Sequence, residues 1–506
     1  MILQPFASRP HSLREQASRN SWQFGIDTFF TQEVPFSSRN SPVFAKQLVG
    51  LFADVAKTIP DETLHVYELG AGLGLLGRYF LETLESDYPD LYAKTCLHLT
   101  ESSAETLQHW AQDQRLTRHD THIRLENVDF LTFSPDHPIA FCYSVYVLDA
   151  LPTRHIGVNI GQICEILVKT ELKEGATVLD TTQDPPTPLS PQALHDLLQN
   201  PSDFRARALA PQWVPALSET FGLMAMDDLP YWTEEDKIWV RQFVENSGLK
   251  GPISFNFIPA LADHFKHIEA ALHPNGLYCV ADFGRTELGN LDMAQLFTPF
   301  GTTLFYGLNY PLLNFLTQQL GFSTWLTERD SGKTQDWVIF KNPAHKNLIE
   351  THLHPSDDPC LDALQTALPT LLKVEATAPI FKALLATLSE ADQKNHTFLT
   401  ALSLKYFMAG DYEATLPLLE TLKTEFGTLG IWGVLVEGWI FEKRGDLTAA
   451  IACYEQVLNT CPTFYTAAFV LADAYHQQKA PDKAEKAFKQ GLLHAPPDEL
   501  KRQLKR

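Results

Sequence analysis

Over residues 40–340, some segments have the apolar runs of buried strands and others have the hydrophobic spacing of helices. This pattern is expected of a chain that alternates between strands and helices. Short apolar runs rich in β-forming residues predict strands over 64–69, 95–100, 122–127, 139–145, 276–283 and 335–340. Intervening segments such as Leu75–Leu84 carry helical periodicity. Strands that alternate with helices in this way predict a doubly wound α/β domain.

A long segment without this alternation separates the fourth predicted strand from the fifth. Residues 180–260 contain a proline-rich connection, followed by aromatic stretches around Trp213, Tyr231, Trp232 and Trp239 that we predict to be helical. Insertions of this size in a compact fold are usually lids or substrate-binding elements. The aromatic faces would suit a nitrogen-bearing acceptor, because a ring stabilises positive charge. Packing in an ordinary core is the alternative interpretation of each tryptophan.

From residue 396 onward the pattern changes to an internal repeat. The turn positions Gly410, Gly445 and Lys479 recur at intervals of 35 and 34 residues. Small and bulky positions recur in register with them: Ser403, Gly438 and Ala472, then Tyr406, Phe441 and Tyr475, then Thr415, Ala450 and Ala484, then Leu419, Tyr454 and Phe488. This resembles the tetratricopeptide repeat, whose helix-turn-helix units stack into a solenoid that binds partner proteins. The sequence therefore predicts an all-α repeat domain.

The first predicted strand ends in an acid and runs into a glycine-rich turn. Glu68 is followed by Gly70, Gly72 and Gly74, and a helix begins at Leu75. Glycine allows a tight turn and close approach of a ligand, and the helix N-terminus favours carboxylate or phosphate. The pattern predicts a nucleoside cofactor. Taken from Gly72, the glycines also fit the dinucleotide pattern, so they leave NAD open.

Two acids favour S-adenosylmethionine (SAM) over a dinucleotide. Glu68 precedes the glycines as in the first motif of class I SAM methyltransferases. Glu101 ends the next strand, where a carboxylate can accept both ribose hydroxyls. Asp129 and Phe130 follow the third strand, and we predict that they border the adenine. For Asp129 a loop role is the alternative.

Four motifs, taken together with the glycine turn, resemble those of the MidA-type SAM-dependent methyltransferases. They begin at Glu101, at Asp129, at Leu148 (Leu-Asp-Ala-Leu-Pro) and at Gly276, the last of these ending in Asp282-Phe283-Gly284. A mitochondrial relative of that family is a complex I assembly factor that methylates an arginine of a partner subunit. The resemblance covers residues 24–340. It implies a class I, Rossmann-like sheet and a protein substrate.

The chain departs from that family at the predicted catalytic position. Val145 and Tyr146 stand where the family has Asn-Glu, so polar groups expected beside the transferred methyl group are missing. Near this point Asp149 is the closest ionisable residue and Tyr146 the closest hydroxyl, and we predict that they are catalytic. Glu33 and Asp282 are further candidate carboxylates. Each of the three acids could instead be a turn or loop residue.

Composition indicates the cellular compartment and the classes of partner that we expect. The chain has 506 residues and a net charge of −21, which argues against nucleic acid as a partner. Seven scattered cysteines, without a CxxC pair or a Cys/His cluster at zinc spacing, indicate reduced core thiols, a cytoplasmic setting and no metal. No apolar run is long enough to span a membrane. Arg9, Arg14 and Arg19 resemble a transit peptide, which makes the mitochondrial matrix the alternative.

The sequence thus predicts four segments. They are an N-terminal helical or loop segment (1–45), a SAM-dependent methyltransferase domain (46–341) with a helical insertion (180–260), a helical linker (342–395) and the repeat domain (396–506). We expect a methyltransferase that acts on a protein, with arginine as the family's acceptor, recruited through the repeats. The alternative is a SAM-binding scaffold with little or no activity. Arg154 and His155, beside Pro152, are predicted to lie on the surface. The oligomeric state is not indicated.

Overall fold

The computed structural model describes residues 1–31, 34, 39–289, 296–327, 329, 334–353, 383, 385–386, 388–389 and 393–505. The chain divides into two compact units. The first combines residues 1–25, 46–178 and 188–357, and the second combines 26–45, 179–187 and 358–506. Among the described residues, no helix is both long enough and apolar enough to cross a bilayer.

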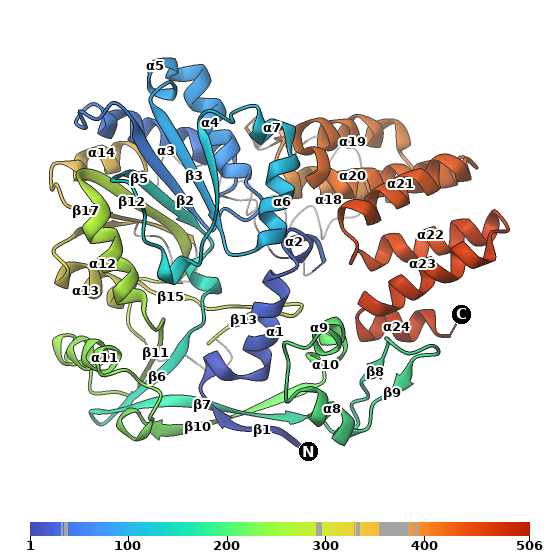
Figure 1. Cartoon of the computed structure of the whole chain (residues 1–506), viewed down its shortest axis with the longest axis horizontal. Helices are drawn as coiled ribbons and strands as arrows, with labels where there is room; N and C mark the ends of the chain where they lie inside the picture. Colours follow the sequence, from blue (N-terminus) through green and yellow to red (C-terminus); the bar gives the residue numbers. More distant parts are fainter. Residues whose placement is uncertain are drawn as a thin grey trace. The chain divides into compact units, whose positions relative to one another are not determined.

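The main sheet of the first unit has eight strands in the order β16-β17-β12-β5-β2-β3-β4, with β15 beside β12 (Figure 1). The five strands from β12 to β4 are parallel, whereas β17 runs antiparallel to both β12 and β16. From β2 the chain proceeds outward through β3 to β4, then returns to place β5 and β12 on the other side of β2. The carboxyl ends of β2 and β5 therefore form a topological switch point, where ligands bind in open α/β sheets.

The six predicted strands are confirmed. Their bounds are β2 (Leu64–Leu69), β3 (Thr95–Glu101), β4 (Ile123–Asn127), β5 (Ile139–Val145), β12 (Leu272–Arg285) and β17 (Thr334–Phe340). The edge strand β16 (Ser323–Leu326) and the short β15 (Leu308–Asn309) were not predicted. Helices on the two faces are α3 (Pro42–Ala56), α4 (Leu75–Asp87), α5 (Pro89–Tyr92), α6 (Ala104–Gln112), α7 (Gln114–Thr117), α12 (Leu261–Ala271), α13 (Tyr310–Gln319) and α14 (His345–His352).

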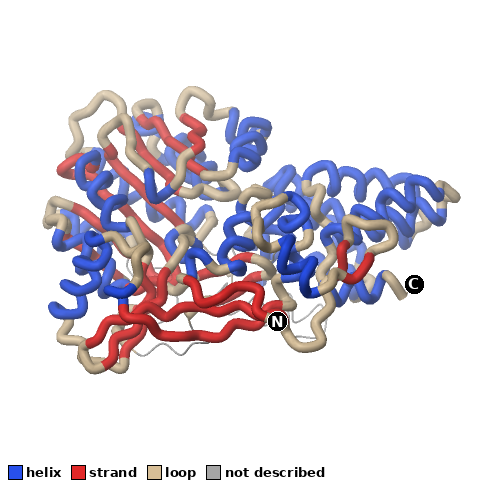
Figure 2. Tube along the Cα trace, turned by 60° about the horizontal axis from the view of Figure 1, so that its bottom comes forward, coloured by secondary structure: helices blue, strands red, loops and turns tan. Residues whose placement is uncertain are grey.

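A second, antiparallel sheet corrects the prediction of a helical insertion. It joins β1 (Ile2–Ala7), β6 (Arg154–Asn159), β7 (Gln162–Leu172), β10 (Leu217–Ala225) and β11 (Ile253–Phe257), which lie side by side in Figure 2. Three short α-helices and one longer one accompany it: α8 (Pro191–Leu197), α9 (Phe204–Ala208), α10 (Ala210–Trp213) and the longer α11 (Glu234–Asn246). The predicted N-terminal segment likewise begins with a strand, followed by α1 (Leu13–Trp22).

The second unit contains the predicted repeats as antiparallel helix pairs. They are α18 (His396–Met408) with α19 (Tyr412–Phe426), α20 (Ile431–Lys443) with α21 (Leu447–Thr460), and α22 (Tyr465–Gln477) with α23 (Pro481–His494), followed by α24 (Pro497–Gln503). The aligned turn residues Gly410, Gly445 and Lys479 all have left-handed backbones, with φ of +77°, +82° and +61°. A side chain at Gly438 would overlap the Tyr454 ring, as expected at a close-packing position.

Part of the predicted linker is described. Residues 345–352 form α14, which contacts α3 within the first unit, where His352 Nε2 lies 2.8 Å from Asp54 Oδ2. Residues 354–382 of the predicted helical linker lie outside the described residues.

Candidate functional site

The glycine turn after β2 has a backbone that other residues adopt only with strain. Gly70, Gly72 and Gly74 have φ of +67°, +53° and +69°. A Cβ at Gly70 would lie 2.8 Å from Val147 Cγ2, and one at Gly74 would lie 2.9 Å from Trp110 Nε1. Gly74 also precedes α4, whose start has no side-chain cap. The turn is therefore a tight backbone loop at the switch point, leading into a helix N-terminus.

Trp110 braces this turn, a role that the sequence did not reveal. Its buried indole donates a hydrogen bond from Nε1 to the carbonyl oxygen of Gly72, at 3.1 Å. On the opposite side, the Ala71 N–H donates to the carbonyl oxygen of Thr100 at 3.0 Å. In the sequence, Trp110 is only a tryptophan on the apolar face of a helix. That pattern is equally typical of ordinary core packing.

Glu101 reaches the glycine turn from the end of β3, as predicted. Its Oε2 accepts a hydrogen bond from the Gly72 N–H at 3.1 Å, and its Oε1 accepts from the Ser102 N–H at 2.8 Å. The parallel pairing of β2 with β3 produces this arrangement, because both strands end at the same edge of the sheet. The side chain is only half-buried. A carboxylate in this position can accept hydrogen bonds from a ligand, while its ribose role stays a prediction.

Glu68 lies beneath α4, on the face of the sheet that this helix covers. Its carboxyl group is buried and accepts a hydrogen bond from the Tyr143 hydroxyl at 3.2 Å. A Cβ at Gly77 would lie 2.5 Å from Glu68 Oε2, so the glycine gives the carboxyl group its space. Burial raises the pKa of Glu68 to about 8. In this structure Glu68 supports the helix, and its contact with a cofactor stays a prediction.

Asp129 and Phe130 follow β4, where they were expected. Asp129 is exposed and caps the short helix η2 (Phe130–Thr132), with Oδ1 accepting from the Leu131 N–H at 2.9 Å. The local role considered for Asp129 is therefore present, and its adenine role stays a prediction. Phe130 is buried and stacks on His264 of α12, with centroids 4.3 Å apart. Burial lowers the pKa of His264 to about 3, so that ring is neutral.

Asp149 and Asp282 form a buried carboxyl pair at the ends of β5 and β12. Asp282 Oδ2 accepts from the Asp149 N–H at 3.2 Å, and its Oδ1 accepts from the Phe283 N–H at 2.7 Å. Both residues are buried, at 2% and 0% exposed. Desolvation, followed by the mutual repulsion, raises the pKa of Asp149 well above its usual range, and desolvation raises that of Asp282 to about 7. The pair therefore retains at least one proton near neutral pH.

The Asp149 carboxyl group pairs with Asp282 and makes no side-chain cap of the turn, although a turn role was the alternative prediction. The same turn is held by its main chain, since the Asp149 carbonyl oxygen accepts from the Tyr306 N–H at 2.6 Å. Glu33, the remaining candidate acid, lies outside the described residues.

Tyr146 occupies a strained backbone position between β5 and Asp149. Its φ is +56°, which is rare for a residue with a bulky side chain. Its N–H donates to the carbonyl oxygen of Ala281 at 3.0 Å, and its ring stacks on Phe283 at 5.3 Å. The hydroxyl lies 3.4 Å from Thr334 Oγ1. Strain of this kind is concentrated at functional sites, and the catalytic role of Tyr146 stays a prediction.

Residues 43–245 match a family of SAM-dependent methyltransferases. The family model is described as "Putative S-adenosyl-L-methionine-dependent methyltransferase". A second model, the tetratricopeptide repeat, matches residues 442–506. SAM is thus the cofactor of the matched family, as predicted from the residues, and the repeat prediction is confirmed. No curated protein matches the sequence.

Solved structures that resemble this chain have low sequence identity to it. A protein of Burkholderia thailandensis, described as a "likely methyl transferase" bound to S-adenosyl-homocysteine, is 15% identical over 72% of this chain and 77% of its own, with a TM-score of 0.38. The CcbJ methyltransferase of Streptomyces caelestis is 10% identical (63% and 97% covered, TM-score 0.29), and MamA is 21% identical (29% and 79%, TM-score 0.21). These TM-scores are below 0.5, so the fold assignment rests on the strand order and the family match.

The alternative of ordinary core packing holds for two of the insertion tryptophans, and a separate prediction, about Arg154 and His155, is wrong. Trp213 and Trp232 are buried core residues, with their indole N–H groups bonded to the Ala206 carbonyl oxygen and to Glu165. They are not available to an acceptor. Arg154 and His155 are buried rather than on the surface, because β6 lies inside the second sheet. The Arg154 guanidinium lies over the Trp232 ring, 4.3 Å from its centroid.

The structure also brings together a group that sequence spacing did not suggest. No metal was predicted, yet His65, Cys96 and His98 each offer a ligand atom within 4.8 Å of the others. Sequence spacing does not reveal this group, because the three residues lie on two neighbouring strands instead of in one local motif. The other described cysteines are also free thiols, and Cys360 lies outside the described residues.

Proposed function

We propose that the chain is a SAM-dependent methyltransferase that modifies a protein substrate, with arginine as the acceptor to test first. The observation that supports it best is the left-handed glycine turn at the switch point, with Glu101 bonded to Gly72. This proposal agrees with the family match and with the resemblance in the sequence. The tetratricopeptide repeats are of a kind that binds proteins, and we propose that they recruit the substrate.

The chain offers a fitting cradle for the cofactor. The left-handed turn at Gly70, Gly72 and Gly74 would place its backbone against the methionine end, beside the uncapped start of α4, whose N-terminus favours a carboxylate. Glu101 would accept hydrogen bonds from the ribose hydroxyls, and Asp129 with Phe130 would border the adenine. When bound, SAM supplies a methyl group that is electrophilic because its sulfur is positively charged.

On the acceptor side, alignment is the main demand, since an in-line displacement at a methyl group needs little acid-base work. Burial makes the Asp149–Asp282 pair retain at least one proton at neutral pH, so the pair carries at most one negative charge near the ends of β5 and β12. That charge would hold a cationic acceptor, and the pair would take the proton that the methylated nitrogen loses. The strained Tyr146 fixes the backbone beside it.

The test is to incubate the purified chain with methyl-labelled SAM and a lysate of its source cells. We expect one labelled protein band. Asp149→Asn should reduce labelling by about 100-fold, the size of the loss when a reacting group is misplaced by about 1 Å. SAM affinity should change little, because Asp149 is not among the predicted cofactor contacts. The matched control is Asp236→Asn, which changes another buried carboxyl group with a raised pKa on α11, and it should label at the wild-type rate.

A SAM-binding scaffold is the second candidate. It is favoured by Val145 and Tyr146 in place of the family's Asn-Glu, and by the burial of Asp149 and Asp282 away from solvent. A wild-type chain that binds SAM but labels no protein would favour the scaffold. Labelling by Asp149→Asn at the wild-type rate would instead reject the catalytic role of the carboxyl pair.

A further inference from the structure

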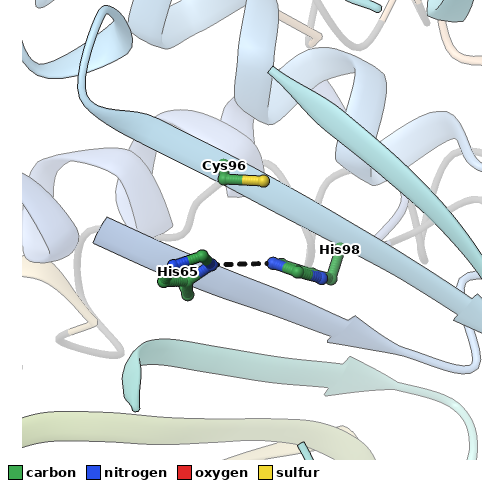
Figure 3. Close-up of side chains that lie close together, drawn as sticks. All are labelled: His65, Cys96 and His98. Carbon is green, nitrogen blue, oxygen red and sulfur yellow. Dashed lines mark hydrogen bonds between the residues drawn. The ribbon is translucent and has the colours of Figure 1, made fainter. Parts of the chain in front are cut away.

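Three potential metal ligands lie together on one face of the main sheet. His65 on β2 is the direct neighbour of Cys96 on β3, and His98 follows two residues later on the same face. Figure 3 shows the two imidazole rings pointing toward each other, with Cys96 above them. His65 Nδ1 lies 2.9 Å from His98 Nε2, and the three ligand atoms all lie within 4.8 Å of one another.

The surroundings hold the His98 ring in the orientation that a ligand needs. Its other nitrogen, Nδ1, is hydrogen-bonded to Glu126 Oε1 on β4 at 2.5 Å. Tyr67 stacks on the ring at a centroid distance of 4.2 Å. A carboxylate behind a histidine is the usual second partner of a metal-binding imidazole, because it fixes the tautomer and raises the basicity of the ligand nitrogen.

We propose that His65, Cys96 and His98 bind one zinc ion, through Nδ1, Sγ and Nε2 respectively, with solvent as the fourth ligand. Nitrogen and thiolate ligands in this number are the set that zinc prefers in tetrahedral sites. Zinc–nitrogen bonds of about 2.0–2.1 Å place two nitrogens about 3.3 Å apart in a tetrahedron. The present separation of 2.9 Å therefore needs to widen by only a few tenths of an ångström.

Binding would replace two protons by the ion. The proton between the two imidazoles would leave, and so would the thiol proton of Cys96, because only the thiolate and neutral imidazole are ligands. His98 is buried, whereas His65 and Cys96 are half-buried, so the ion can enter from their side.

The proposed zinc site is separate from the proposed cofactor site. His65 and Cys96 lie five residues before Gly70 and Glu101 on the same two strands. At about 3.3 Å per residue along the strands, His65 and Cys96 lie about 16 Å, and His98 about 10 Å, from the residues of the proposed cofactor site. Zinc binding and SAM binding should therefore be separable, and the zinc proposal does not depend on the proposed function.

Cobalt(II) is the probe for the full-length chain after removal of metals with a chelator. We expect one equivalent to give the intense visible bands of tetrahedral cobalt and a thiolate-to-cobalt charge-transfer band, both abolished by added zinc. Cys96→Ser should remove the charge-transfer band. Glu126→Gln should weaken metal binding by about 10–100-fold, as expected for the carboxylate behind a ligand. The matched control is Cys164→Ser, another half-buried cysteine, on β7, which should keep both bands.

The competing interpretation is a histidine pair that shares a proton over Glu126 and needs no ion. It predicts no thiolate band in the wild type, and that result would overturn the zinc proposal. A band that persists in Cys96→Ser would overturn it as well. If Cys96→Ser does not fold, as judged by circular dichroism, His65→Asn gives a second test, because loss of a nitrogen ligand should weaken metal binding while the charge-transfer band persists at high cobalt.

Discussion

Gly72 has a left-handed backbone and also lies in the proposed cofactor site. Its φ is +53°, and its N–H and carbonyl oxygen bond to Glu101 and Trp110. We expect Gly72→Val to abolish SAM binding, because the side chain forces the turn out of this conformation and occupies ligand space. Isothermal calorimetry measures the effect. Gly161→Val is the matched control: Gly161 has φ of +76° in the β6–β7 turn with open space around it, so affinity should be retained.

The buried Glu68 carboxyl group should make the stability of the chain depend on pH. A buried carboxyl group with a raised pKa keeps its proton where the unfolded chain has lost it, so the free energy of unfolding falls as pH rises between the two values. For Glu68 that interval runs from about 4.5 to about 8. Between pH 6.5 and 8 the thermal midpoint of the chain should fall, and Glu68→Gln should flatten this decline, because glutamine does not ionise. Exposed Glu174→Gln is the control and should follow the wild type; an unchanged slope in Glu68→Gln would contradict the assignment.

The positions of single site residues could be predicted from the sequence where a local motif determines them. The glycines and Glu101 follow directly from strands that end at a common edge. The direction of a side chain across the sheet was harder: Glu68 is one residue from the turn yet faces α4, because alternate residues of a strand point to opposite faces. Partners such as Asp282 for Asp149, or His98 for His65, come from other strands and leave no local signal.

Among the elements, the central parallel strands were predictable and the second sheet was not. A strand buried on both faces, such as β5, reads as a nearly continuous apolar run. The edge strands β1 and β10 expose or half-expose most of their residues, so they lack a clear pattern. One of the five strands of the second sheet, β1, also pairs with a segment more than 140 residues away, β7.

The repeat helices give a prediction at the same scale. Gly438 on α20 lies against Tyr454 on α21, where a side chain would overlap the ring. Gly438→Val should therefore destabilise the repeat unit by about 1–3 kcal/mol or more, the range for overpacking a core. Chemical denaturation followed by circular dichroism measures this change, while SAM affinity should stay unchanged. Thr424→Val on the exposed face of α19 is the control and should have little effect; equal destabilisation by both variants would argue against close packing at Gly438.

At the scale of the whole molecule, the two compact units do not follow the order of the sequence. Residues 26–45 and 179–187 belong with the repeats. Asp27 accepts hydrogen bonds from Thr463, and Asp184 pairs with Lys489 at 2.6 Å. Leu179 packs beside a cluster that includes Phe469 and Leu492. Such long-range pairings are invisible to periodicity, and the predicted domain boundaries stay a prediction.

The placement of α14 determines where the α/β unit can be cut. A boundary at Lys341 would remove α14, although His352 pairs with Asp54 on α3 and its ring lies close to Gly50. Leu353 and Ile349, both buried, would be lost as well. We therefore expect a fragment of residues 1–353 to unfold at a higher temperature than one of residues 1–341, by roughly 2 °C or less for each kcal/mol of lost packing.

Scanning calorimetry on the two fragments and the full chain measures these midpoints, and titration with SAM measures cofactor affinity. Both fragments lack the helices that hold Asp27 and Asp184, so both should be less soluble than the full chain. The longer fragment should bind SAM as tightly as the full chain, because Gly70–Gly74, Glu101 and Asp129 all lie in the first unit. Equal midpoints for the two fragments would show that α14 adds nothing to the α/β unit. Loss of SAM binding in the longer fragment would show that the cofactor site needs the second unit.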